Sequence, residues 1–319
     1  MNQKTVFVTG GTGKIGRYLV ARLASLGFRV KVLSRKKDSP WSKTGNVQII
    51  QGDILDENTI KKAVKGCDYL FHLAVYQNIN DKKNDLFQRV NIEGTKIILN
   101  SLINSGVKKV VYVSTAMVFE PTGKLARNEE WTQKTSCPND NYLQTKIEAL
   151  AFVRDMKKFL PILVVYPTAV IDLKDFSSST PTLSKGWQKL LWEKIGKGIP
   201  GGIVNLIGPK DRIFNYIVVE DLVESMIQAA IVGQAGEEYI LGSENISVEN
   251  YLRLASQRVN KRVFPIRLPF CLFKIISQLK RFISLPPIIN LIAQAPPKDM
   301  CLSSDKARKF LKHNPKLKL

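Results

Sequence analysis

In the first half of the chain, hydrophobic residues follow two patterns: short continuous runs and a spacing of three or four residues. Short apolar, β-branched runs predict buried strands, and these lie at 6–8, 30–33, 47–50, 69–73, 110–113 and 162–165. Apolar residues spaced three or four apart predict helices at 15–26, 58–64, 86–105 and 142–159. Strands that alternate with helices are typical of a parallel sheet with crossover helices.

The pattern becomes less regular after Tyr166. It predicts a polar loop at 177–182, an amphipathic helix with Trp187 and Trp192, strands at 215–218 and 239–241, and helices at 221–232 and 248–259. Residues 264–297 are hydrophobic, basic and interrupted by six prolines. We expect an α/β fold: a Rossmann-type doubly wound parallel sheet over 1–166, to which 215–232 returns, and a smaller C-terminal substrate-binding lobe over most of 167–319.

Three glycines follow the first strand directly. Gly10, Gly13 and Gly16 stand between the apolar run and the amphipathic segment. In this context one glycine allows a tight turn, one lets backbone N–H groups approach a pyrophosphate, and one lets the helix pack closely on the strand. Because the motif lies between a predicted strand and a predicted helix, it predicts a dinucleotide site rather than an ordinary turn.

Tyr142 and Lys146 stand four residues apart in a predicted helix. That spacing puts the phenol and the ammonium on one face, where the positive charge would lower the phenol pKa from its ordinary value near 10. The strand at 110–113 leads into Ser114 and Thr115. Hydroxyls at the carboxyl end of such a strand lie where open α/β sheets bind their ligands. The three groups therefore predict acid–base chemistry on a carbonyl or an alcohol.

The end of the second strand bears on the choice of cofactor. NAD enzymes place a carboxylate there for the ribose 2′-hydroxyl, whereas an arginine accommodates a 2′-phosphate. This chain has Arg35 followed by two lysines, and its first acid is Asp38. We therefore expect NADP, with NAD as the alternative; a solvated basic turn would also explain the pattern.

The order of these motifs resembles that of the extended short-chain dehydrogenase/reductase superfamily, also called the NAD-dependent epimerase/dehydratase family. The resemblance covers essentially the whole length and rests on TGGTGKIG at 9–16, GDI at 52–54, HLAV at 72–75, NIEGT at 91–95, VSTAMVF at 113–119 and YLQTK at 142–146. Within it, the chain looks most similar to the dihydroflavonol-4-reductase-like group, which includes hopanoid-associated sugar epimerase-like proteins.

The resemblance implies that Tyr142 is the acid–base residue, that Lys146 lowers its pKa and holds the nicotinamide ribose, and that Thr115 is the catalytic hydroxyl. Other positions match the parts of the family pattern that line the cofactor channel. Asp53 and Ile54 would lie against the adenine, Pro167 and Val170 would approach the nicotinamide carboxamide, and His72 would contribute by its backbone alone. The implied cofactor-binding residues are Gly10, Thr12, Gly13, Lys14, Ile15, Gly16, Arg35, Asp53, Ile54, Leu73, Ala74, Val75, Asn91, Val113, Tyr142, Lys146, Pro167 and Val170.

Two positions depart from the family pattern. Tyr166 stands where many relatives have Arg or Asn before the proline, and Phe119 replaces a common Tyr. We expect both aromatic residues to reshape the substrate pocket, so that a nucleotide-sugar substrate does not follow from the resemblance.

Composition narrows the remaining choices. The net charge is +21, and residues 258–319 hold 14 Lys and Arg against two Asp. No nucleic-acid motif accompanies this charge, so we expect no nucleic-acid partner. The apolar and basic segment 264–297 could contact a membrane surface, but we favour a lid over the substrate pocket or a dimer contact. Four scattered Cys and two His predict no metal site and a cytoplasmic protein with reduced thiols.

These expectations converge on an enzyme. The favoured hypothesis is NADPH-dependent reduction of a ketone or aldehyde, or the reverse oxidation, on a small-molecule substrate that the sequence does not identify. One alternative is a nucleotide-sugar epimerase or dehydratase that retains NAD. Another is a non-catalytic nucleotide-binding assembly factor. A homodimer through the helices at 86–105 and 142–159 is compatible with the pattern.

Overall fold

The computed structural model of the chain describes residues 3–37, 41, 44–77, 85–176, 202–207, 212–259, 262–267 and 299–318. The predicted loop at 177–182, the helix with Trp187 and Trp192, and most of the proline-interrupted segment 264–297 lie outside the described residues.

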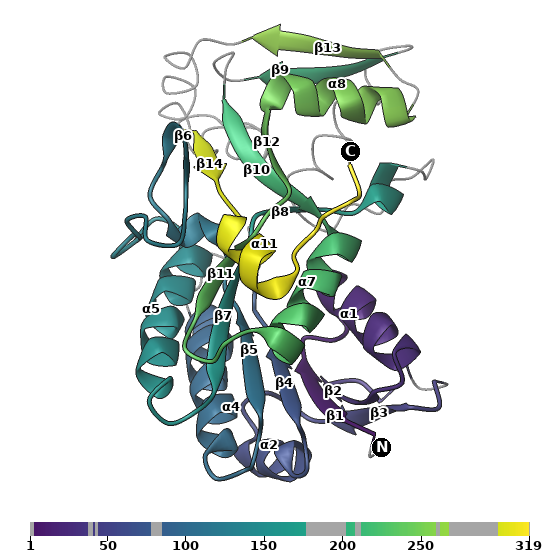
Figure 1. The fold of residues 1–319 in the computed structure, drawn as a ribbon, viewed down its shortest axis with the longest axis vertical. Coiled ribbons are helices and arrows are strands. Elements are labelled where there is room, and N and C mark those ends of the chain that lie inside the picture. The colour runs from purple at the N-terminus through teal and green to yellow at the C-terminus, as the bar shows by residue number, and fades with distance from the viewer. Residues whose placement is uncertain are drawn as a thin grey trace.

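A seven-stranded sheet in which every neighbouring pair is parallel forms the centre of the fold (Figure 1). Its strands are β1 (Thr5–Thr9), β2 (Arg29–Ser34), β3 (Val47–Gln51), β4 (Tyr69–His72), β5 (Lys109–Val113), β7 (Ile162–Pro167) and β11 (Glu238–Leu241). Their order across the sheet is β11-β7-β5-β4-β1-β2-β3. The chain reverses its direction of travel between β1 and β4, and the crevice at such a point is where open α/β sheets bind ligands. The Rossmann-type prediction is confirmed.

Helices cover both faces of this sheet. One hydrophobic cluster joins the sheet to α2 (Glu57–Val64), α4 (Gly94–Leu102) and α5 (Asn141–Met156). A second cluster joins it to α1 (Lys14–Ser25), α7 (Val219–Val232) and α11 (Asp305–Leu311). Side chains alternate along β1, so Phe7 packs in the first cluster and Val6 and Val8 in the second. All three are fully buried.

The helix predicted over 86–105 is not continuous. It begins as α3 (Asp85–Phe87), widens into a π-helical turn at η1 (Gln88–Glu93), and resumes as α4, which ends at Leu102. π-helical turns inside longer helices are frequent at functional sites. Asn91 lies in this turn, and its contacts are described below.

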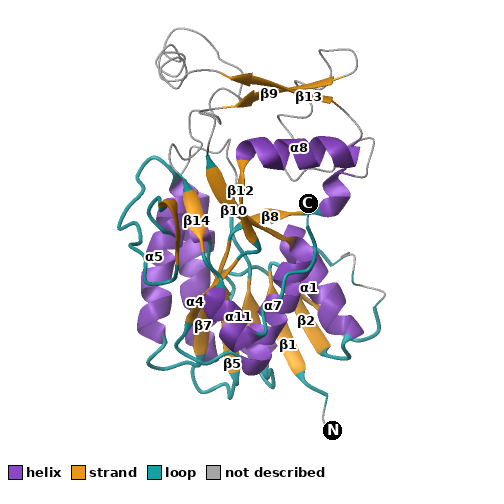
Figure 2. Ribbon diagram, turned by 45° about the horizontal axis from the view of Figure 1, so that its top comes forward, coloured by secondary structure: helices purple, strands orange, loops and turns teal. Residues whose placement is uncertain are grey.

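A second, smaller group of strands lies beyond the carboxyl ends of the main sheet (Figures 1 and 2). β6 (Gly123–Arg127), β8 (Ala169–Ile171), β10 (Ile213–Val218), β12 (Glu244–Ser247) and β14 (Met300–Leu302) form one sheet, and β9 (Gly202–Ile207) pairs with β13 (Arg262–Arg267). α8 (Val248–Val259) follows β12. The strands predicted at 215–218 and 239–241 and the helices at 221–232 and 248–259 are confirmed. The other strands of this group, β6, β8, β9, β12, β13 and β14, were not predicted.

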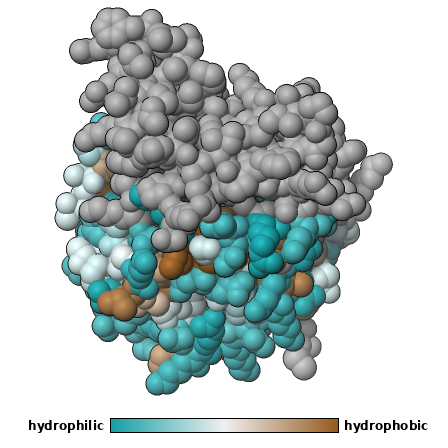
Figure 3. Space-filling model, turned by 90° about the horizontal axis from the view of Figure 1, so that it is seen from above, coloured by the Kyte–Doolittle hydropathy of each residue, from teal (hydrophilic) through white to brown (hydrophobic). Residues whose placement is uncertain are grey.

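Four features of the described residues concern membrane spans, metal ligands, thiols and the hydropathy of the surface. No helix within it is long and apolar enough to cross a membrane, and no group of three or more His, Cys, Asp or Glu within it could hold a metal ion. Cys67, Cys137 and Cys301 are free thiols. Where Figure 3 shows described residues, hydrophilic ones predominate, and the hydrophobic ones form only small groups.

Candidate active site

The glycine-rich turn lies tightly against the strand next to it. Gly10 has a φ of +73°, and a Cβ built there would lie 2.6 Å from the backbone nitrogen of Ala74. A Cβ on Gly16 would lie 2.1 Å from the carbonyl oxygen of Gly10. Only glycine fits either position, because the obstructing atoms belong to backbone. α1 then begins with no side-chain cap and no acid in its first turn. This cradle fits a dinucleotide phosphate.

The predicted adenine end is assembled by packing. Ile54 is buried, and a Cβ on Gly94 would come within 3.0 Å of its side chain. The Gly94 of the NIEGT motif therefore lets the helix approach Ile54. Asp53 accepts a hydrogen bond from the backbone N–H of Leu55 at 3.0 Å, which shapes the turn after β3. Arg35 lies exposed just after β2, and Asp38 is outside the described residues.

A chain of buried hydrogen bonds begins at the end of β1. The Thr9 hydroxyl lies 2.7 Å from Nδ1 of His72, and Nε2 of His72 lies 2.9 Å from the Thr95 hydroxyl. Thr95 in turn donates to the carbonyl oxygen of Asn91 at 2.7 Å. Burial, and then the charge of Lys146, lowers the pKa of His72 to about 3, so this ring is neutral and holds the ends of β1 and β4 together.

Asn91 continues this connection to the helix that carries Tyr142. Its side-chain oxygen accepts from the Tyr76 backbone N–H at 2.6 Å, and its NH₂ donates to the Tyr76 carbonyl at 3.1 Å and to the Thr145 hydroxyl at 2.9 Å. Thr145 donates to the carbonyl of Tyr142 or Asn141, at 2.9 and 3.0 Å. Asn91 is only 2% exposed and its side chain binds protein groups. Its predicted part in cofactor binding would thus be indirect, through the backbone near Ala74.

Lys146 extends across the carboxyl end of β5. Its ammonium donates to the Val113 carbonyl at 2.8 Å and lies 4.9 Å from the centre of the Tyr112 ring. The side chain is buried, and burial lowers the pKa of Lys146 to about 7. A buried amine next to a carbonyl and a ring face can therefore change its charge in the physiological range when another group approaches.

Tyr142 and Thr115 come together as predicted for the site, but one expectation needs correction. The Thr115 hydroxyl forms a hydrogen bond that favours the ionised form of Tyr142. Burial and the neighbouring Asp140 outweigh it and raise the pKa of Tyr142 to about 12. The expectation that Lys146 lowers the pKa of Tyr142 below its ordinary value is therefore wrong when only the protein's groups are considered. The dominant effect on this pKa is desolvation of the phenolate. At neutral pH Tyr142 is a protonated phenol.

The remaining predicted residues border the same edge of the sheet. Ser114 is buried, and its hydroxyl has no hydrogen-bond partner among the described residues. An unpaired buried hydroxyl beside Thr115 is suited to a bound ligand. Pro167 ends β7, and Val170 lies in β8, where it pairs with Ile217 of the second sheet.

Tyr166 and Phe119 do not line a pocket as expected. Both side chains are 0% exposed, and their rings meet edge to face with centres 5.0 Å apart. The Tyr166 hydroxyl donates a hydrogen bond to Glu238 on β11. The two departures from the family pattern therefore alter packing beneath the site rather than the surface a substrate would touch.

Sequence reasoning missed the residues that support the site. Thr9, Thr95 and Thr145 carry the buried hydrogen-bond chain, and Lys134 holds the turn after Thr115 by donating to the Met117 carbonyl at 2.9 Å and to the Phe119 carbonyl. Single hydroxyls and an isolated lysine give no periodic signal. The three threonines could have drawn attention only because they lie within the TGG, NIEGT and YLQTK motifs.

Known proteins resemble this chain over much of its length. Residues 7–158 match the model of the 3-beta hydroxysteroid dehydrogenase/isomerase family. The chain is 27% identical to sterol demethylase protein B of Methylococcus capsulatus over 78% of this chain and 73% of that protein. It is 27% identical to a putative dihydroflavonol 4-reductase of Synechocystis, over 88% and 82%. A 4-hydroxy-2-methyl-3-oxo-4-farnesyl-3,4-dihydroquinoline-1-oxide ketoreductase of Stigmatella aurantiaca is 24% identical, over 96% and 90%.

Solved structures share the fold over nearly the whole chain. The crystal structure of gox2253 superposes with a TM-score of 0.78 at 25% identity, covering 98% of this chain and 94% of that one. MoeE5 in complex with UDP-glucose and NAD superposes with a TM-score of 0.73 at 18% identity, covering 99% and 94%. The second likeness is one of fold alone.

The neutral His72 predicts a distinctive pH dependence of stability. Its pKa is about 3 in the folded protein against about 6.5 when unfolded. The unfolded chain therefore binds the extra proton, and stability should fall as the pH drops from 6.5 toward 3. Replacing His72→Asn removes this group, so the unfolding free energy should decline less steeply, by up to about 1.4 kcal/mol per pH unit. Urea unfolding at several pH values measures it; parallel pH profiles would contradict a buried neutral ring.

Proposed function

Because the chain belongs to the extended short-chain dehydrogenase/reductase superfamily, an NAD(P)-dependent enzyme family, we propose that it is an NADPH-dependent reductase of a ketone or aldehyde. The observation that carries the proposal is the convergence of Thr115, Tyr142 and Lys146 at the carboxyl end of β5. The phenol there is held in its protonated form, the form that can give a proton to a carbonyl oxygen.

The glycine cradle, the Ile54 packing and the unpaired Ser114 hydroxyl fit a dinucleotide cofactor. NADPH, when bound, supplies a hydride to the carbonyl carbon. Gly10, Gly13 and Gly16 would receive its pyrophosphate, and Arg35 would pair with a 2′-phosphate through its planar guanidinium. Lys146 would lie against the nicotinamide ribose and gain charge there.

The chain's own residues then handle the proton. Thr115 donates a hydrogen bond that orients the carbonyl oxygen, while the Tyr142 hydroxyl transfers its proton to that oxygen as the C–H bond forms. The product is a secondary or primary alcohol and a tyrosinate, which is reprotonated from solvent. A Lys146 ammonium stabilises the tyrosinate between these events. Positioning of this kind, with a proton donor in reach, accounts for most of what the protein adds to the cofactor.

Relatives named as a ketoreductase and as a putative dihydroflavonol 4-reductase support reduction over the alternative. An epimerase or dehydratase would retain its NAD through the catalytic cycle, and the exposed Arg35 in place of a carboxylate counts against NAD. We further propose that the enzyme is cytoplasmic and acts on a small molecule without a nucleic-acid partner.

Replacing Tyr142→Phe tests the role of the phenol. The change should lower kcat for NADPH-dependent reduction across a panel of ketones and aldehydes by about 10² to 10⁴-fold, with NADPH affinity little changed. Tyr69→Phe is the matched control, because Tyr69 lies at the amino end of β4, the end of the strand opposite to the candidate site. NADPH absorbance reports the rate. Equal activity of Tyr142→Phe and the parent would refute the mechanism; a purely structural nucleotide-binding role predicts no turnover by either protein.

Arg35 should decide between the two cofactors. Arg35→Asp places a carboxylate where the 2′-phosphate would lie, so the ratio of NADPH to NADH affinity should fall roughly tenfold or more, a change of about 1.4 kcal/mol. Arg29→Asp, an exposed position at the other end of β2, should leave the ratio unchanged. Calorimetric titration with each cofactor gives both constants. An unchanged ratio in Arg35→Asp would mean that Arg35 does not contact the cofactor.

A further inference from the structure

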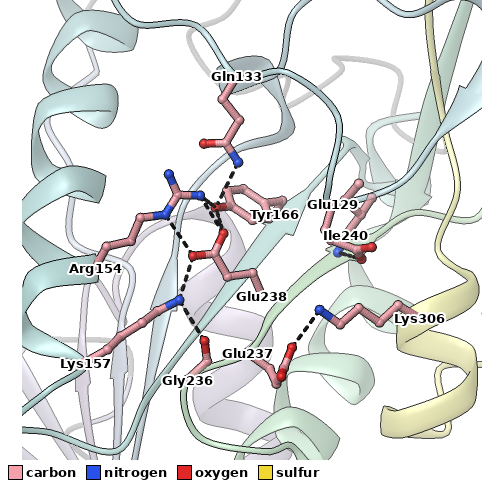
Figure 4. A network of polar contacts seen from close by, with 10 residues as sticks. All are labelled: Glu129, Gln133, Arg154, Lys157, Tyr166, Gly236, Glu237, Glu238, Ile240 and Lys306. Atoms are coloured by element: carbon pink, nitrogen blue, oxygen red, sulfur yellow. Dashed lines mark hydrogen bonds and ion pairs between the residues drawn. The ribbon is translucent and has the colours of Figure 1, made fainter.

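On β11, the edge strand of the main sheet, one carboxylate accepts hydrogen bonds from several donors. Glu238 begins β11, and its side chain is 16% exposed. Arg154 donates to it through Nε at 2.9 Å and Nη2 at 2.6 Å, and Lys157 donates at 2.6 Å. Arg154 lies in the last turn of α5, and Lys157 is the first residue after the helix. Figure 4 shows both cations reaching from α5 to Glu238. The carboxylate thus attaches α5 to the edge strand.

Tyr166 joins this cluster from the neighbouring strand. Its hydroxyl donates to Glu238 at 2.5 Å and accepts from Arg154 at 3.1 Å and from Gln133 at 3.4 Å (Figure 4). Burial acts to raise the pKa of Glu238, but the hydrogen bonds from Arg154, Lys157 and Tyr166 lower it to about 2. The carboxylate is therefore charged throughout the working range of pH. Charge-assisted bonds of this kind are shorter and stronger than neutral ones.

The other end of Tyr166 contacts the turn that carries Thr115. Its ring packs edge to face on Phe119 at 5.0 Å, and Phe119 directly follows the turn that Thr115 caps, at Ala116–Val118. Gln133, which binds the Tyr166 hydroxyl, also bridges Phe119 through the backbone. The Tyr166 side chain therefore contacts Phe119, the residue that follows the Thr115 turn, with its ring and Arg154 of α5 with its hydroxyl.

Its backbone adds a third connection, because Tyr166 directly precedes Pro167, a residue predicted to lie near the nicotinamide. A tightly packed interior transmits small displacements rather than absorbing them. A shift of Tyr166 would therefore alter the relative placement of Thr115 and of the helix with Tyr142.

We propose that Tyr166 is a positioning residue that sets the separation between the Thr115 turn and α5, with Glu238 as the charged group that holds its hydroxyl. The inference rests on the proposed function for its consequence in catalysis, but not for its geometry. Tyr166 is not itself a proton donor to substrate, since it is fully buried beneath the site.

Tyr166→Phe removes the hydroxyl and keeps the ring on Phe119. The matched control is Glu237→Gln, which removes an ion pair with Lys306 at the adjacent position (Figure 4) without touching α5 or Tyr166. Tyrosine labelled with ¹³C at Cζ, assigned by Tyr142→Phe, reports the surroundings and the titration of Tyr142 by NMR. In the same proteins, kcat for NADPH-dependent reduction and KM for the best carbonyl of the panel are measured.

We expect Tyr166→Phe to move the Tyr142 resonance and its titration, and to lower kcat roughly tenfold or more with KM within about twofold, as for a misplaced reacting group. Glu237→Gln should change neither. An unmoved Tyr142 resonance in a folded Tyr166→Phe protein would overturn the proposal. If Tyr166→Phe does not fold, Phe119→Leu tests the ring contact by the same resonance. A moved resonance without reductase activity in the parent protein would leave positioning supported and refute the proposed function.

Discussion

The site depends on the close approach of Gly10 to the backbone that leaves β4. The turn after β1 adopts a positive φ and lies so near Ala74 that no Cβ could be accommodated. The neutral His72 ring connects the same two strands by bonding to Thr9. The open crevice of a doubly wound sheet lies where the chain changes direction, between β1 and β4. Closing these two strand ends with backbone and buried hydrogen bonds gives the phosphate cradle a rigid base.

From that base a continuous set of buried polar contacts extends toward α5. These contacts connect the glycine turn to the backbone carbonyls at the start of the helix that carries Tyr142. They are made by Thr9, His72, Thr95, Asn91 and Thr145. Buried polar groups are costly unless they are paired, and each bond in this chain has a donor and an acceptor. At the other end of α5, the hydrogen bonds from Arg154 and Lys157 to Glu238 attach the helix to β11. The helix that carries Tyr142 is therefore held at both ends by polar contacts and along its length by apolar packing.

The fold could be predicted, and the main candidate residues could be proposed, because both depend on local signals. Glycine spacing after a strand, the alternation of strand and helix, and the four-residue spacing of Tyr142 and Lys146 each depend on a few neighbouring positions. The surroundings of those residues could not be predicted in this way. Tyr166 binds Glu238, which lies 72 positions farther along the chain, so the sequence around position 166 predicts a change in the pocket instead of this buried contact. The π-helical turn contains Asn91, whose side chain binds the backbone of Tyr76, 15 residues earlier, and a 3.6-residue period does not reveal such a contact. The raised pKa of Tyr142 depends on burial, which spacing alone does not give.

The most direct test of an exchangeable NADPH cofactor is mass spectrometry of whatever nucleotide is released from the freshly purified, denatured protein. The account predicts little or no retained nucleotide, or a small amount of NADP(H) that is removed by dialysis. Stoichiometric NAD that resists dialysis would contradict it, and epimerisation or dehydration with internally recycled hydride would then be the better description.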